Sequence, residues 1–147
     1  MREISFRAKR IKDGAWVCGP LFYYDGCVAI GWNHGIEVDE EGLKPYTYDF
    51  VDHKTVSEYT GINDSEELYI YENDLVKYGS YIGCAKFENG AFGLAYFDEE
   101  GNAIFTPFIL LKVNNCMRMP ELKIVGNRFD TPCATKVDIE KLLEQEG

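Results

Sequence analysis

The chain has 147 residues, with 25 acidic and 15 basic side chains that give a formal net charge of −10 at pH 7. A surface this acidic repels a phosphate backbone and attracts cationic partners, which disfavours nucleic acid as a ligand. The hydrophobic content of 46% excludes a disordered chain, and no window approaches the ~20 apolar residues that a membrane-spanning helix needs.

The N-terminal segment is locally basic. Apolar residues at positions 4, 6 and 8 alternate with polar ones, which is the period-two pattern of a half-buried strand. Two interpretations are open, a phosphate-binding arm or the solvated face of that strand. No glycine-rich cradle follows, so the sequence favours the solvated face. The basic residues of this segment are Arg2, Arg7, Lys9, Arg10 and Lys12.

The next predicted element is a hairpin of two aromatic-rich segments, residues 15–24 and 27–32. They are joined by Asp25-Gly26, a dipeptide that tolerates the positive φ angles of a tight loop. Asp13-Gly14 predicts a turn before the first segment. Gly19-Pro20 predicts a kink or an edge position within it.

The clearest local prediction is a hairpin centred on Asn89-Gly90. A type I′ loop at these two residues would put most apolar side chains of the hairpin on one face. A third strand is expected after residues 100–102, in a meander that continues into residues 108–113. The predicted cross-strand pairs are Glu88–Ala91, Phe87–Phe92, Ala85–Leu94 and Gly83–Tyr96.

Only the C-terminus has a helical pattern. Thr135 is placed to cap a helix, and Asp138 follows three residues later, as in a capping box. A strand is expected at residues 122–125, and Pro132 separates it from the helix. The apolar stripe of the helix consists of Ile139, Leu142 and Leu143.

The cysteines and histidines show no recognisable site. His34 and His53 belong to no zinc-ligand spacing, and the chain has no glycine-rich nucleotide loop and no GxSxG motif. A Cys-His pair assembled by folding stays open, but a buried thiol is the commoner role. The five cysteines are Cys18, Cys27, Cys84, Cys116 and Cys133. Their odd number and wide spacing argue against a disulfide framework and predict a reducing compartment, with most thiols as small core residues.

The stretch ELYIYENDLVKYG at residues 67–79 places Glu72 and Asp74 on either side of Asn73. Residues two apart point to the same side of a straight strand, so the two carboxylates could converge on a metal or a scissile bond. Alternatively, they flank a sharp corner and accept hydrogen bonds from nearby backbone N–H groups. No histidine, lysine or third carboxylate is tied to the pair by a recognisable spacing, which favours the corner.

Three ordered segments stand out: residues 2–9 (REISFRAK), 56–76 (VSEYTGINDSEELYIYENDLV) and 123–132 (KIVGNRFDTP). Together they resemble the YopX family of phages and prophages. The middle segment is similar to the hallmark of the family, and the other two resemble its first strand and its closing element. The family usually has glycine in place of Asn73, and asparagine is the commonest substitute that tolerates a positive φ, which supports the corner. The motif residues are therefore expected to be structural: Tyr59, Thr60, Gly61, Asp64, Tyr71, Glu72, Asn73, Asp74, Gly126 and Asn127.

The resemblance implies a mainly β, antiparallel fold. It further implies an SH3-like barrel lobe packed with N-terminal strands, one short C-terminal helix and no established enzymatic activity. We expect residues 1–147 to form one YopX-like domain, either continuous or as two interlocked lobes at about residues 1–62 and 63–147.

Two functions from different classes follow. The leading hypothesis is a non-enzymatic phage or prophage accessory protein in the cytoplasm of the host bacterial cell. Its small barrel would present tyrosine and phenylalanine side chains to a protein partner. The alternative is a divalent-metal-dependent hydrolase or nuclease-like enzyme that uses Glu72, Asp74 and Asp64. A third idea, mimicry of DNA, rests on net charge alone. The sequence predicts no cofactor, no metal and no membrane partner, and it leaves a homo-oligomer open.

Overall fold

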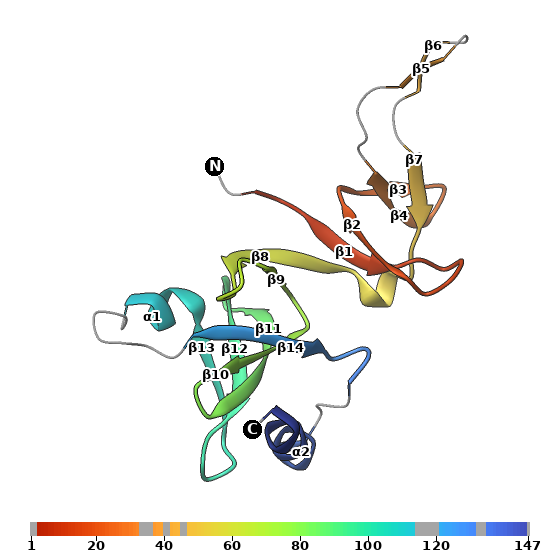
Figure 1. The fold of residues 1–147 in the computed structure, drawn as a ribbon. Helices are drawn as coiled ribbons and strands as arrows, with labels where there is room; N and C mark the ends of the chain where they lie inside the picture. Colours follow the sequence, from red (N-terminus) through yellow and green to blue (C-terminus); the bar gives the residue numbers. More distant parts are fainter. Residues whose placement is uncertain are drawn as a thin grey trace. The chain divides into compact units, whose positions relative to one another are not determined.

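The computed structural model describes residues 3–32, 37–39, 42–44, 47–113, 121–131 and 135–146. The chain divides into two compact units, unit 1 at Met1–Tyr59 and unit 2 at Thr60–Gly147. Both are built mainly from antiparallel strands (Figure 1), which confirms the fold class expected from the sequence. Among the described residues, no helix is long and apolar enough to cross a membrane.

Unit 1 contains short strands and one 3₁₀ helix. Strands β3, β4 and β7 form one sheet in the order β3-β4-β7, and β5 pairs with β6. Strand β8 (Ser57–Asn63) begins in unit 1, where it pairs with β1, and ends in unit 2. The bounds are β1 (Phe6–Lys9), β2 (Trp16–Gly19), β3 (Leu21–Tyr24), β4 (Cys27–Trp32), β5 (Glu37–Asp39), β6 (Gly42–Lys44), β7 (Thr47–Phe50) and η1 (His53–Thr55).

The predicted hairpin of unit 1 is present between β3 and β4. Its loop residues Asp25 and Gly26 have φ angles of 51° and 76°. The predicted kink at Gly19-Pro20 separates β2 from β3. Glycine is required there because a Cβ at Gly19 would collide with the carbonyl oxygen of Gly31. The buried core of the unit consists of Ala8, Ile30 and Val51.

Unit 2 is organised around a curled five-stranded sheet (Figure 1) in the order β13-β12-β11-β10-β14. The short strand β9 (Tyr69–Tyr71) lies beside β8. The bounds of the five strands are β10 (Asp74–Tyr78), β11 (Tyr81–Glu88), β12 (Ala91–Phe97), β13 (Ala103–Pro107) and β14 (Leu122–Asn127). The first core cluster of the unit consists of Ile70, Val76, Ala85, Leu94, Phe108 and Leu111.

The Asn89-Gly90 hairpin between β11 and β12 has the predicted register. Both loop residues have positive φ angles, 50° and 82°, as a type I′ loop requires. The predicted apolar face is only partly buried, because Ala85 and Leu94 lie in the core whereas Phe87 is 52% exposed. Three of the four predicted pairs are observed, namely Ala85–Leu94, Phe87–Phe92 and Glu88–Ala91.

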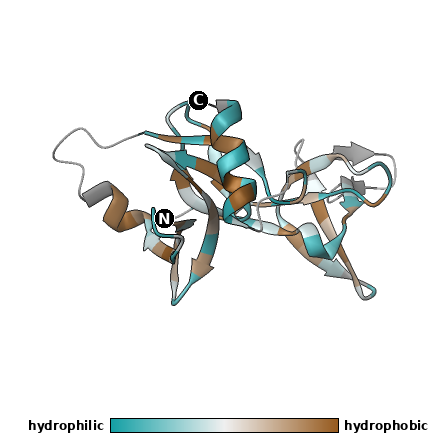
Figure 2. Ribbon diagram, turned by 90° about the horizontal axis from the view of Figure 1, so that it is seen from below, coloured by the Kyte–Doolittle hydropathy of each residue, from teal (hydrophilic) through white to brown (hydrophobic). Residues whose placement is uncertain are grey.

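Helix α2 (Lys136–Glu146) packs against the second face of this sheet. The predicted capping box is present: the Asp138 N–H donates to Thr135 Oγ1, and the Thr135 N–H donates to Asp138 Oδ2, both at 3.2 Å. Figure 2 shows hydrophobic and hydrophilic residues alternating along the helix. The apolar stripe Ile139, Leu142 and Leu143 contacts Leu75 and Ile82 of the sheet, as the sequence predicts.

One element differs from the prediction. Residues 108–113 form a helix, α1 (Phe108–Val113), instead of continuing the meander after β13. A short apolar run fits a strand or a helix equally well by composition, and here Phe108 and Leu111, three residues apart, are buried while Ile109 and Leu110 are exposed. The expectation that only the C-terminus is helical was therefore wrong.

The cysteines also differ from the prediction. Of the three cysteines that the structure describes, Cys18 and Cys27 are exposed, and half-buried Cys84 packs against a core cluster, so two of these three are not core residues. Cys18 faces outward because it alternates with half-buried neighbours on β2, and Cys27 directly follows the loop at residues 25–26. Cys116, Cys133 and Pro132 lie outside the described residues.

Candidate functional site

The predicted corner is present between β9 and β10. Asn73 has a φ of 71°, in the left-handed region. Its N–H donates to the carbonyl oxygen of Ala85 at 2.7 Å, and its own carbonyl oxygen accepts from the Arg128 N–H at 2.9 Å. Asp74 is only 1% exposed, and its Oδ2 accepts from the Tyr71 N–H at 2.8 Å. The corner thus links three segments of unit 2 through main-chain hydrogen bonds.

Asp64 closes the loop between β8 and β9. Its side chain is buried, and Oδ1 accepts from the N–H groups of Glu66 and Leu68, both at 2.9 Å. Oδ2 accepts from the Ile124 N–H of β14 at 3.2 Å. One carboxylate therefore serves three backbone donors, which is a structural use of the group.

The motif residues at positions 59–61 also stabilise the local backbone. Thr60 Oγ1 donates to the Ile70 carbonyl oxygen at 2.7 Å, which fixes β9 beside β8. Gly61 has a φ of 84°, which favours glycine. Tyr59, the last residue of unit 1, is buried, and its N–H donates to the Ser5 carbonyl oxygen at 2.8 Å.

The closing motif forms a bulge and a turn at the end of β14. Asp74 faces Asn127 and Leu75 faces Gly126, and the register then shifts by one residue. Asn127 Oδ1 accepts from the N–H groups of Phe129 and Asp130, both at 3.0 Å. This is an Asx-type turn, and it directs the chain at Arg128 back over the sheet.

These contacts show what the two buried carboxylates, Asp64 and Asp74, bind. Asp64 and Asp74 are engaged by backbone N–H groups, so a metal ion at either would have to displace main-chain hydrogen bonds. Across the described part of the chain, no group of three or more His, Cys, Asp or Glu side chains could hold a metal ion. Both carboxylates therefore bind the backbone of unit 2.

The basic N-terminal segment is engaged in ring contacts and ion pairs. The Arg7 guanidinium and the Lys9 ammonium lie 4.7 and 5.3 Å from the ring centroid of Trp16. Arg10 pairs with Asp13 at 2.7 Å, and hydrogen bonds from the Ala15 N–H and from Arg10 lower the pKa of Asp13. Arg7, Lys9 and Arg10 are half-buried, so the face that the sequence predicts to be solvated is only partly exposed. Arg2 lies outside the described residues.

A group of exposed aromatic rings lies on the β3-β4-β7 sheet of unit 1. Phe22 and Tyr48 are 5.6 Å apart between ring centroids, and Tyr48 and Phe50 are 5.4 Å apart, both in edge-to-face contacts. Tyr48 is 42% exposed and Phe50 is 38% exposed. The rings flank the small residues Ala29 and Gly31 of β4, which leave room for them. We call Phe22, Tyr48 and Phe50 the aromatic face.

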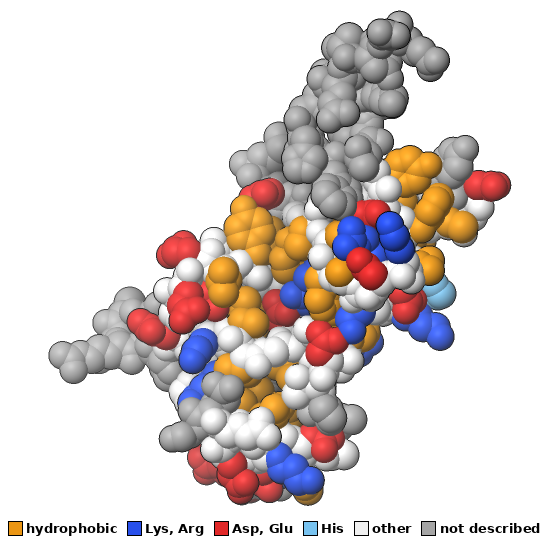
Figure 3. Space-filling view, turned by 45° about the vertical axis from the view of Figure 1, so that its right-hand side comes forward, with side chains coloured by type: hydrophobic (Ala, Val, Ile, Leu, Met, Phe, Trp, Pro, Cys, Tyr) orange, Lys and Arg blue, Asp and Glu red, His pale blue; other side chains and the backbone are white. Residues whose placement is uncertain are grey.

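The sequence offered only a weak signal for this face. Tyr48 and Phe50 are two residues apart on one strand, which places them on the same side, but Phe22 joins them only because β4 lies between β3 and β7. Exposed hydrophobic side chains occur beside acidic and basic ones on the surface drawn in Figure 3. The sequence predicts the aromatic surface on the barrel lobe, whereas Phe22, Tyr48 and Phe50 belong to unit 1.

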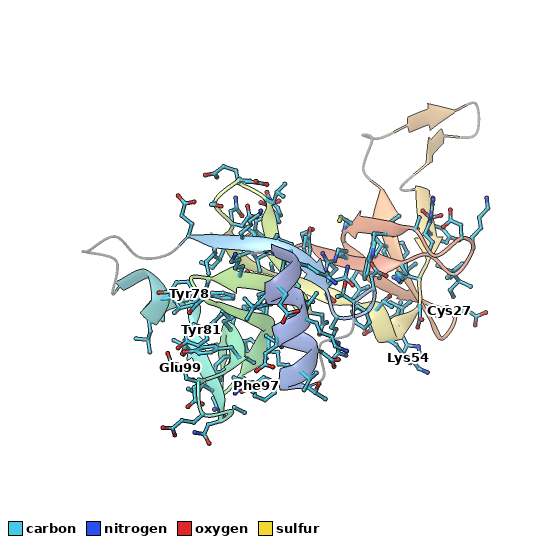
Figure 4. The ribbon with its side chains drawn as sticks, turned by 60° about the horizontal axis from the view of Figure 1, so that its bottom comes forward. Cys27, Lys54, Tyr78, Tyr81, Phe97 and Glu99 are labelled. Carbon is cyan, nitrogen blue, oxygen red and sulfur yellow. The ribbon has the colours of Figure 1, made fainter. Side chains whose placement is uncertain are left out.

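Two of the hollows on unit 2 are lined by charged and aromatic side chains. The larger of these two, about 590 Å³, lies over β11, β12 and β13. The smaller, about 350 Å³, lies beside α2 and includes Tyr81 and Glu99, which appear next to each other in Figure 4. Tyr81 Oη donates to Glu99 Oε1 at 3.4 Å, and the negative charge of Glu99 raises the pKa of Tyr81. Burial, the largest cause, raises the pKa of Tyr78 as well.

The fold and the motif residues define a mainly antiparallel β protein in which buried polar side chains bind the backbone. The family model described as the YopX protein matches residues 5–134, so the chain belongs to the YopX family. The comparison with curated proteins found no match.

Proposed function

We propose that this YopX family member is a non-enzymatic accessory protein of a phage or prophage, and that it works in the host cytoplasm by binding a protein partner. The aromatic face carries the proposal. Its three rings form one contiguous group on the β3-β4-β7 sheet, and two of them are more than a third exposed. Aromatic residues are enriched in protein interfaces.

The backbone hydrogen bonds of the motif carboxylates favour a binding role over a metal-dependent reaction. The hydrolase hypothesis uses Glu72 and Asp74 with Asp64 as a third carboxylate, and two of these three, Asp64 and Asp74, accept hydrogen bonds from the backbone. A catalytic role is not required to explain these residues, because their hydrogen bonds to the main chain already do so.

The charge of the chain indicates which partner surface fits. The net charge is −10, and aromatic ring faces attract cations. We therefore expect the partner to present lysine or arginine side chains together with apolar residues.

A site-specific cross-linking experiment tests the proposal. A photoreactive phenylalanine replaces Tyr48 in the chain expressed in the host bacterium, and the same group replaces Ile11, which is 69% exposed in the same unit, as a control. We expect one dominant cross-linked protein from position 48 and none from position 11. That protein is then purified and titrated against the wild-type chain.

The titration uses matched variants. Tyr48→Ser and Phe50→Ser should weaken binding of the captured protein by about tenfold or more, since truncating a central aromatic contact costs upwards of ~1.4 kcal/mol. Ile11→Ser should leave the affinity unchanged. Equal cross-linking from both positions, or equal affinity of all three variants, would contradict the proposal.

A further inference from the structure

The larger hollow of unit 2 lies on the sheet face that α2 leaves partly open. Side chains alternate across a strand, so the residues opposite the first core cluster share this face. The ring of Phe105 lies close over Gly93, where a Cβ would meet its Cζ at 2.6 Å. We call this hollow, of about 590 Å³, the β13 groove. Its lining includes Cys84, Lys86, Ala95, Phe97, Phe105 and Arg128.

Two basic side chains, Lys86 and Arg128, lie at the β13 groove. Residues 60–147 contain eight basic and fifteen acidic side chains, a net charge of −7, yet the groove is lined by Lys86 and Arg128 against one acidic residue, Glu88. Within the part of the chain that the structure describes, no ion pair engages Lys86 or Arg128. A locally positive, apolar hollow in an acidic unit is complementary to a ligand with carboxylates and apolar side chains.

Arg128 is positioned by the family motif. Its backbone N–H donates to the carbonyl oxygen of Asn73 at 2.9 Å, and its guanidinium lies 5.0 Å from the ring centroid of Phe129. The Asn127 turn fixes the next residues of the same loop. The corner at Asn73 and the closing motif therefore place a cation beside the groove.

The groove is bordered by an edge strand. Among the described strands, β13 pairs only with β12 and ends the five-stranded sheet. Its last residue, Pro107, cannot donate a backbone hydrogen bond, which suits an edge position. The outer side of β13 offers main-chain donors and acceptors to an added strand.

We propose that the β13 groove binds an extended, acidic segment of a protein partner. The segment adds to β13 as a further antiparallel or parallel strand, places apolar side chains against Phe105 of β13, and directs a carboxylate across the groove toward Lys86 and Arg128. The β13 groove belongs to unit 2 and attracts acidic ligands, whereas the aromatic face belongs to unit 1 and attracts basic ones. The inference therefore does not rest on the proposed function.

A peptide titration tests the inference with the full chain. The probe is a fluorescent seven-residue peptide that alternates threonine with phenylalanine, glutamate and phenylalanine, so that both rings and the carboxylate lie on one side. Anisotropy should report saturable binding, and amide NMR signals of Ala103–Phe105 should shift. Replacing the glutamate of the peptide by lysine should weaken binding by about tenfold.

Matched protein variants locate the contact. Lys86→Gln and Arg128→Gln should each weaken binding by about fivefold or more, whereas Lys123→Gln, an exposed lysine of β14 outside the groove, should not. Tyr48→Ser should also leave the peptide affinity unchanged, which separates this test from that of the aromatic face. The amide NMR spectrum of each variant shows whether it is folded.

A second form of the peptide distinguishes a strand from other ligands. Methylation of alternate backbone nitrogens blocks strand addition on one edge, and it should abolish binding when the methylated edge is the one that faces β13. Equal binding of the lysine peptide or of both methylated forms would overturn the inference. So would the absence of binding by every peptide at millimolar concentration.

Discussion

The backbone N–H of Ile124 donates a 3.2 Å hydrogen bond to Oδ2 of Asp64, 60 residues earlier in the chain. The other oxygen of the same carboxylate holds two N–H groups of its own loop. Asp64 therefore joins the turn between β8 and β9 to the strand that forms one edge of the five-stranded sheet. A buried side chain in this role contributes to the stability of unit 2.

Asp64→Ala should lower the free energy of unfolding by about 2–4 kcal/mol. Each buried N–H group that loses its acceptor costs ~1–3 kcal/mol, and local rearrangement of the loop reduces the total. Asp64→Asn retains one acceptor oxygen and should lose less. Urea denaturation midpoints of both variants check this order, with the exposed Glu66→Ala as control. A value for Asp64→Ala within about 0.5 kcal/mol of wild type would show that the carboxylate is not structural.

Asn73 allows a direct test of the corner. With φ at 71°, Asn73→Gly should be neutral or slightly stabilising, because glycine reaches this region without Cβ strain. Asn73→Val should lose about 1 kcal/mol or more, the cost of a β-branched residue in the left-handed region. The comparison requires only denaturation midpoints. Equal stability of the two variants would refute the corner.

The features that could be predicted from the sequence are those set by neighbouring residues. Asn89-Gly90 and Asp25-Gly26 carry their loop geometry in two residues, and Thr135 and Asp138 cap a helix across one turn. The position of Asn73 followed from its own backbone preference together with the family motif. These predictions needed no knowledge of distant contacts.

The features that could not be predicted depend on sheet order or on packing. Phe22 meets Tyr48 only because β4 separates β3 from β7. The run at residues 108–113 became helical because its first and fourth residues pack into the core. The partners of Asp64 likewise required the position of β14, since no local pattern connects residue 64 to Ile124. Non-local pairing decides each of these cases.

The capping box predicts a measurable loss at α2. Thr135→Ala removes the acceptor of the Asp138 N–H and should cost about 1 kcal/mol, the usual value for an N-cap. Thr135→Ser keeps the hydroxyl and should stay close to wild type. Thermal unfolding of the two variants, measured side by side, checks the difference. If alanine and serine prove equivalent, the hydroxyl does not stabilise the helix.

Tyr81 should titrate above its ordinary pKa of 10.0, mainly because of the negative charge of Glu99. A raised pKa favours the protonated phenol in the folded state, so this contribution is complete below the unfolded pKa and is lost as the pH rises through the folded one. NMR titration of ¹³C-labelled tyrosine should show a lower Tyr81 pKa in Glu99→Gln. Glu100→Gln serves as control, and an equal shift in both variants would reject Glu99 as the cause.

Variants at Asp74 and Glu72 distinguish a structural role of these carboxylates from a role in a metal-dependent enzyme. Asp74 is 1% exposed and accepts from the Tyr71 N–H at 2.8 Å, so Asp74→Asn should lower stability by about 1–3 kcal/mol, since its amide group introduces buried donors. Glu72 is half-buried, and Glu72→Gln should change stability by less than about 0.5 kcal/mol.

Thermal unfolding of the wild type and of both variants is then repeated with magnesium, manganese and calcium. We expect no rise in the melting temperature for wild type or for either variant, because the carboxylate of Asp74 is already bonded to the backbone. A metal-dependent rise that disappears in Asp74→Asn would instead identify these carboxylates as a metal site and restore the hydrolase.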